Sequence, residues 1–177
     1  DAVIMGEQLG AALGFMECAW WSPTYKIPDG RVLALIAGKS NPGSIMVNQL
    51  GKRFANEAQP YEDLVKAQYA SEARGEGAIP CYLIFDATYR GKYAVGHSKP
   101  PANFESGLLT RADSLEELAD QLRIDRASLL NTVSNFNHHA RNGEDPEFNR
   151  GATQHDRYYA DKTVIPNPSL GPLEIAP

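Results

Sequence analysis

The order of the apolar patterns along this chain limits its fold more than any other feature. An expected helix comes first, the apolar run at 31–37 predicts a buried strand, and further strand-like runs lie at 45–48 and 81–85. Two helical patterns follow near 115 and 126. No unit of strand, helix and parallel strand repeats along the sequence. This order predicts an α+β fold in which a small antiparallel or mixed sheet packs against helices.

Start and stop signals place the helices. Ser114 is followed three residues later by Glu117, a capping box that predicts a helix start. Asp125 is placed to cap a second helix, and Gly143 is placed to end it. Pro60 predicts the start of another helix that runs to about residue 74, because a first-turn position does not need its N–H.

The N-terminal stretch 1–17 carries apolar residues at a helical spacing, on one face of an expected helix. The residues on this face are Leu9, Leu13 and Met16.

The totals exclude several classes of protein. The chain has 177 residues, room for one domain, and a net charge of −5, which argues against a nucleic-acid surface. No apolar run approaches the roughly 20 residues that span a bilayer. Cys18 and Cys81 lack a CxxC spacing and predict reduced thiols in a cytoplasmic protein, although a disulfide between them stays open.

One short motif speaks to function. The run from Ile45 to Glu57 ends in Gly-Lys-Arg-Phe-Ala-Asn-Glu, and Tyr61 follows four residues later. Together with Cys81–Asp86 and the stretch from Thr110 through Phe136, it resembles the substrate domain of flavoproteins related to fumarate reductase and succinate dehydrogenase. The tail, with 156–159 and 167–171, looks most like the 3-ketosteroid dehydrogenase branch.

The resemblance implies a division of the parent protein. In this family a substrate domain is inserted into a flavin domain, so residues 1–18 are expected to be a helix of the flavin domain and 19–177 the substrate-binding capping domain. The chain has no G-x-G-x-x-G fingerprint. We therefore expect no cofactor-binding residue here, an FAD held by the rest of the parent, and an isolated chain that is inactive. Its expected partner is the flavin-binding domain of the same polypeptide.

Tyr61 carries the implied chemistry. Removal of hydrogen beside a ketone needs a base for the proton and an acceptor for hydride, and the base must lie opposite the flavin. In the fumarate reductase branch an arginine stands at this spacing, whereas ketosteroid dehydrogenases use a tyrosine. A free phenol has a pKa of about 10, so a tyrosine base needs a hydrogen-bond donor or a positive charge nearby. The resemblance thus implies that Tyr61 is the general acid/base and also contacts an apolar ketone.

Other functions stay open. Fumarate reductases carry a proton relay at places that hold Ala37 and Ser40 here, and Ser22-Pro23-Thr24 stands where they carry a substrate contact. These differences favour the ketone branch. A fumarate-reductase-like domain acting on another enone or small acid is the second alternative, after a dehydrogenase of a steroid-like cyclic ketone. A non-catalytic binding or dimerisation module is the third.

The remaining candidates each have two interpretations. Trp21 and Tyr25 either line an apolar substrate mouth or pack between domains. Arg53 and Glu57 either shape the site or form a structural ion pair. His138 and His139 are adjacent on a helix and point apart, so we expect no metal site.

Overall fold

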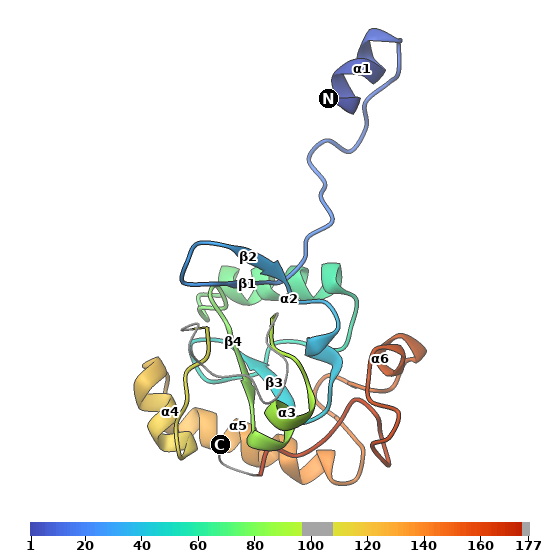
Figure 1. Ribbon diagram of the computed structural model, residues 1–177. Coiled ribbons are helices and arrows are strands. Elements are labelled where there is room, and N and C mark those ends of the chain that lie inside the picture. Colours follow the sequence, from blue (N-terminus) through green and yellow to red (C-terminus); the bar gives the residue numbers. More distant parts are fainter. Residues whose placement is uncertain (97–107, 175–177) are drawn as a thin grey trace.

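The computed structural model describes residues 1–96 and 108–174 and has an α+β architecture. Figure 1 shows two small sheets among helices, with the first helix standing apart at the end of an extended segment. In chain order the elements are α1 (Ala2–Gln8), β1 (Thr24–Lys26), β2 (Val32–Ala34), the 3-10 helix η1 (Gly38–Ser40), β3 (Ser44–Val47), α2 (Tyr61–Ala73), β4 (Tyr82–Phe85), α3 (Ala87–Lys92), α4 (Leu115–Leu122), α5 (Arg126–Ala140) and α6 (Gln154–Tyr158).

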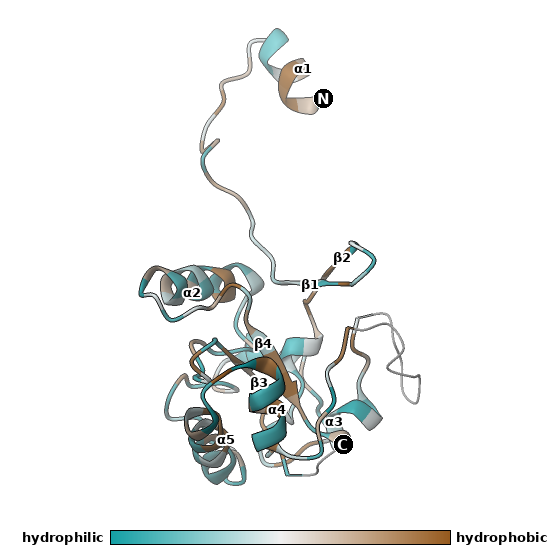
Figure 2. Ribbon diagram, turned by 90° about the vertical axis from the view of Figure 1, so that its left-hand side faces the viewer, coloured by the Kyte–Doolittle hydropathy of each residue, from teal (hydrophilic) through white to brown (hydrophobic). Residues whose placement is uncertain are grey.

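The β3–β4 pair is the centre of the body. The two strands are antiparallel, with Ser44 opposite Phe85 and Val47 opposite Tyr82. All four β3 residues are buried, and successive side chains point to opposite faces. Helices therefore cover both faces, with α2 on one side and α4 and α5 on the other (Figure 2).

Each face of this pair has its own core. The α5 core joins the sheet to α4, α5 and the tail, and the α2 core joins it to α2 and the segment after β2. The α5 core comprises Ile45, Val47, Ile84, Ala119, Ile124, Leu129, Val133, Phe136, Ala140, Leu170 and Leu173. The α2 core comprises Leu35, Met46, Phe54, Ala55 and Leu64.

The predicted helix starts are confirmed. The Glu117 N–H donates to Ser114 Oγ at 3.1 Å, and the Ser128 N–H donates to Asp125 Oδ1 at 2.7 Å. The Glu117 carboxylate accepts from the Asp113 N–H, one residue before the expected donor. α2 also begins after Pro60 and ends at residue 73, as expected.

The sheet differs from the expected single one. The four strands form two separate antiparallel pairs, β1–β2 and β3–β4. The apolar run at 31–37 was expected to be a buried strand, but β2 exposes Val32 by 60%. Only Leu35, just after the strand, enters the α2 core. A hairpin of this kind lies on the surface, so apolar composition alone misjudged its burial.

The expected N-terminal helix over 1–17 is too long. α1 ends at Gln8, and Gly10 follows with a φ of +82°, a left-handed conformation that ends helices. No residue of α1 is buried, and Figure 1 shows the helix away from the body. Tertiary packing normally stabilises a short amphipathic helix, and none is present here.

Two further observations concern the cysteines and membrane-spanning helices. Cys18 and Cys81 are both free thiols. Among the described residues, no helix is long and apolar enough to cross a bilayer.

Candidate functional site

Tyr61 is the first residue of α2 and is half-buried. The residue before it, Pro60, is extended, with φ −49° and ψ 142°. Its ring holds φ, and its carbonyl accepts the Leu64 N–H at 3.0 Å to begin the helix. The orientation of Tyr61 is therefore set by the segment that leads from the motif into α2.

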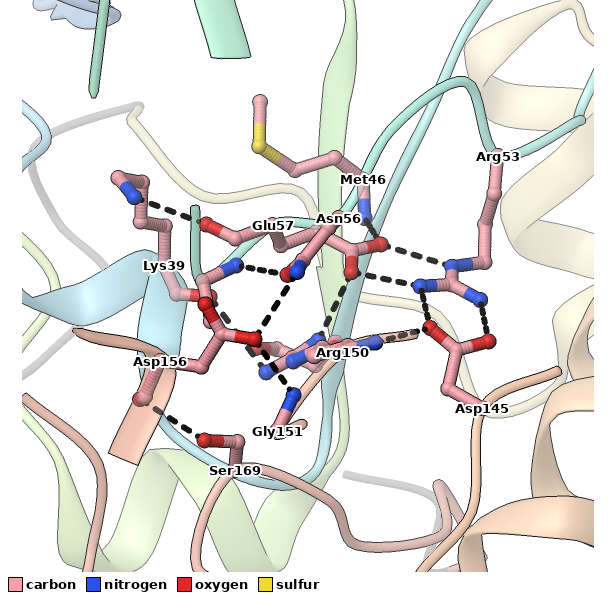
Figure 3. Close-up of polar contacts among 12 residues, drawn as sticks. Lys39, Met46, Arg53, Asn56, Glu57, Asp145, Arg150, Gly151, Asp156 and Ser169 are labelled. Atoms are coloured by element: carbon pink, nitrogen blue, oxygen red, sulfur yellow. Dashed lines mark hydrogen bonds and ion pairs between the residues drawn. The ribbon is translucent and has the colours of Figure 1, made fainter. Parts of the chain in front are cut away.

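The Glu57 carboxylate anchors that segment. It is fully buried and accepts the Met46 N–H at 3.0 Å, which ties the segment to β3. It also accepts Arg53 Nε at 2.9 Å and Nη2 at 2.8 Å, and Arg150 Nη1 at 3.1 Å (Figure 3). Four donors on one carboxylate hold the motif rigidly against the sheet.

Arg53 extends the network to the tail. Its Nη1 and Nη2 donate to the two Asp145 oxygens at 2.8 and 2.9 Å. The rings of Phe136 and Phe148 lie 5.0 and 4.9 Å from its guanidinium carbon. The ion-pair interpretation of Arg53 and Glu57 is thus confirmed, because both side chains are buried and paired.

Burial and charge work against each other on these carboxyls. Burial raises the pKa of Glu57, but the charges of Arg53 and Arg150 outweigh it and hold that pKa below its usual value. Burial likewise raises the pKa of Asp145, and Arg53 reverses the shift. Both groups stay ionised at neutral pH.

Four partners in this network were missed by the sequence analysis: Lys39, Asp145, Arg150 and Asp156. Arg150 is 1% exposed and donates to the carbonyls of Ser44 and Asn41 at 2.6 and 2.7 Å. The tail that holds Arg150 shows only a polar composition without periodicity. Nothing in such a pattern indicates a buried arginine.

The other predicted site residues lie apart from one another. Trp21 precedes β1 and is 47% exposed. Its ring packs edge-on against Tyr69 of α2, with 5.7 Å between the two ring centroids. Tyr69 is eight residues along α2 from Tyr61, a rise of roughly 12 Å.

Tyr25 lies on β1 and packs against the α2 core. Burial raises its pKa, and the neighbouring Tyr89 adds to the shift. Trp21 thus contacts α2 eight residues along from Tyr61, whereas Tyr25 is partly buried against the α2 core.

Comparison with known proteins places the chain in a family. A family model described as "FAD binding domain" matches residues 1–171. The chain belongs to this family. The match covers both the N-terminal arm, residues 1–20 with α1, and the body that follows it.

Named relatives agree with this membership. A "3-oxosteroid 1-dehydrogenase" of Mycolicibacterium smegmatis is 40% identical over 186 residues, covering 100% of this chain and 32% of that protein. A "4-oxocyclohexanecarboxylate 2-dehydrogenase" of Sinomonas cyclohexanicum is 39% identical over 185 residues, covering 100% and 32%. The crystal structure of the 3-ketosteroid delta1-dehydrogenase from Sterolibacterium denitrificans, in complex with 1,4-androstadiene-3,17-dione, has a TM-score of 0.88 at 38% identity. The match covers 100% of this chain and 33% of the chain in that crystal structure.

The chain thus spans about a third of the length of the relatives it matches. Within 1–96 and 108–174 the strands pair only antiparallel, and no strand passes through a glycine fingerprint into a parallel unit. Nor does this part of the chain gather three histidine, cysteine or acidic side chains that could hold a metal ion.

Proposed function

We propose that this chain is the substrate-binding, capping part of an FAD-dependent dehydrogenase of cyclic ketones, with Tyr61 as its general acid/base. In this proposal the flavin-binding domain lies in the same polypeptide and supplies the hydride acceptor, and residues 1–18 belong to that domain. One observation carries the proposal. A half-buried tyrosine begins α2 directly after a motif that is rigidly held by buried charges.

The geometry suits a base on a covering domain. A catalytic tyrosine must keep one orientation while its hydroxyl reaches the substrate. The backbone before Tyr61 is held by the Glu57 network, while Tyr61 itself keeps part of its surface accessible. In the reaction, the deprotonated Tyr61 oxygen takes the proton from the carbon beside the ketone, and the hydride from the adjacent carbon goes to the acceptor that the flavin-binding domain supplies. The donor that favours its ionised form belongs to the flavin-binding domain in this proposal.

The substrate class follows from the relatives' names. One is named for a 3-oxosteroid and another for 4-oxocyclohexanecarboxylate, and both names specify a ketone on a carbon ring. We therefore propose an apolar cyclic ketone of steroid type, which Trp21 contacts from the segment before β1. Tyr25 supports this surface from the α2 core.

A dicarboxylate substrate fits the site less well, because it would need cationic side chains free to face it. The buried cations Arg53 and Arg150 already pair with Glu57, Asp145 and backbone carbonyls. Their side chains are 1% and 0% exposed, so neither is open to a small dianion. A fumarate-reductase-like activity therefore ranks second.

Replacing Tyr61 by Phe in the full-length, flavin-loaded parent tests the proposal. Turnover of a 3-ketosteroid with an artificial electron acceptor is expected to fall by about 10²–10⁴, because a positioned acid or base supplies that factor. Flavin absorbance should stay unchanged.

Tyr82→Phe is the matched control, because that ring packs against the α5 core on the other side of the sheet. Equal turnover by wild type and Tyr61→Phe would exclude Tyr61 as the base. A wild-type parent that reduces only fumarate would establish the second alternative. A parent without flavin absorbance would favour a non-catalytic module.

A further inference from the structure

A buried lysine faces the segment that carries Tyr61. Lys39 lies in the 3-10 helix η1 and is only 2% exposed. Its Nζ donates to the Glu57 carbonyl at 2.9 Å and also to the Gln59 carbonyl. One ammonium group therefore binds two carbonyls of the stretch 57–60 that leads into α2, and Figure 3 shows its bond to the Glu57 carbonyl.

The second of these carbonyls matters most. The Gln59 C=O belongs to the peptide unit that joins Gln59 to Pro60, and the proline ring fixes the next torsion angle. With that peptide unit held, only the Pro60 ψ angle remains to turn the Tyr61 backbone. Lys39 thus fixes the peptide unit directly before the last adjustable backbone angle that precedes the tyrosine.

The other side of the segment is held independently. The Asn56 side chain accepts the Ala58 N–H at 2.9 Å and donates to Asp156 at 3.0 Å. Arg150 in turn binds the carbonyl of Asn41, which follows η1. The lysine and the segment it holds are both fixed to the tail. The two bonds from Lys39 to the Glu57 and Gln59 carbonyls, here called the Lys39 clamp, therefore join two rigid parts of the fold.

A charge in this place is costly for folding. Burial lowers the pKa of Lys39 to about 8, and the nearby Arg150 charge adds to the shift, while Asp156 and Glu57 oppose it. An apolar side chain of the same length would avoid the cost of burying a charge. Retaining a lysine here is consistent with a requirement for its donors.

We propose that Lys39 is a positioning residue for Tyr61, holding the Glu57 and Gln59 carbonyls so that the tyrosine keeps one orientation toward the substrate. The catalytic part of this inference rests on the proposed function of Tyr61. The clamp itself is a property of the fold and can be measured separately.

The test compares wild type, Lys39→Met and Lys39→Arg in the full-length, flavin-loaded parent by amide hydrogen exchange. In Lys39→Met the amides of 57–64 should exchange at least about 10-fold faster, because local opening costs less free energy. The β3 and β4 amides should keep their wild-type rates. Lys39→Arg retains donors and is expected to restore protection. Lys52→Met is the matched control, since Lys52 is exposed in the same motif.

Turnover of a 3-ketosteroid gives the functional readout. With the substrate surface intact, kcat should fall by about 10- to 100-fold in Lys39→Met at an unchanged KM, because a misplaced catalytic group slows the chemical step. Lys39→Arg should recover most of kcat.

Three results would overturn the positioning role: unchanged exchange at 57–64, faster exchange throughout the domain, or a local rise in exchange without loss of kcat. If Lys39→Met does not fold, Lys39→Gln replaces it in the same comparison. If the wild-type parent turns over no cyclic ketone, the proposed function fails. The exchange comparison still decides whether the clamp exists.

Discussion

At the scale of single residues, Lys39 makes stability depend on pH with a predictable sign. Its pKa falls from 10.5 in the unfolded chain to about 8 in the folded one. Between these values the unfolded state binds more protons, so the free energy of unfolding rises with pH in that window. Below pH 8 the lysine is charged in both states, and its burial costs on the order of 3 kcal/mol.

The difference in unfolding free energy between wild type and Lys39→Met isolates this effect, because the other titrating groups largely cancel. It should shift in favour of wild type by about 2 kcal/mol from pH 8 to about pH 10. Urea unfolding of the chain at several pH values measures it. The groups that face the ammonium are Glu57, Asp156 and Arg150. A difference that stays flat or falls with pH would show that Lys39 keeps its proton.

At the scale of elements, Gly51 allows the turn at the start of the Gly51–Glu57 motif to pack closely against α5. Its φ is +71°, and a Cβ there would lie 3.0 Å from the Leu129 N. The Gly51 carbonyl also accepts Thr132 Oγ1 at 2.7 Å. Gly51→Ala should lower the free energy of unfolding by about 2 kcal/mol or more, from left-handed strain and this contact together.

Gly75→Ala is the matched control for that prediction. Gly75 has a similar φ of +75°, but a Cβ there would meet nothing within 4 Å. Strain alone should then cost about 1 kcal/mol. Urea unfolding of both variants separates the two contributions, and equal losses would mean that the turn does not press on α5.

Sequence signals within a few residues correctly predicted where helices begin. The Ser114 and Asp125 caps and the Pro60 start were confirmed because a helix end depends on a few adjacent residues. The helix expected over 1–17 was too long, and the run at 31–37 was less buried than expected. Both errors concern contacts that the rest of the chain supplies or withholds, which periodicity does not reveal.

At the scale of the whole molecule, the buried charges join distant parts of the chain. Arg53 and Asp145 are 92 positions apart, and Arg150 and Glu57 are 93. The motif drew attention to Arg53 and Glu57, but no sequence pattern joined them to Asp145 or Arg150. A charge network of this kind arises only when the tail folds back over η1 and β3, so the sequence alone predicts part of the site and not its support.

The N-terminal arm, residues 1–20, has no buried residue. α1 buries no residue, and its apolar side chains, with those of the following segment, stand in solvent. Exposed apolar surface of this extent usually marks an interface. The most exposed large side chains on the arm are Ile4, Met5, Leu9, Phe15, Met16 and Trp20.

Deleting residues 1–18 should therefore leave the body's stability within about 0.5 kcal/mol of wild type, because no buried contact is lost. The same deletion should reduce self-association of the chain, as measured by sedimentation velocity. A triple variant, Leu9→Ser, Phe15→Ser and Met16→Ser, tests apolarity at full length and should behave like the deletion. A loss of more than about 1 kcal/mol on deletion would instead mean that the arm packs on the body in solution. In that case the proposed interface with a flavin-binding domain would have to form by displacing the arm.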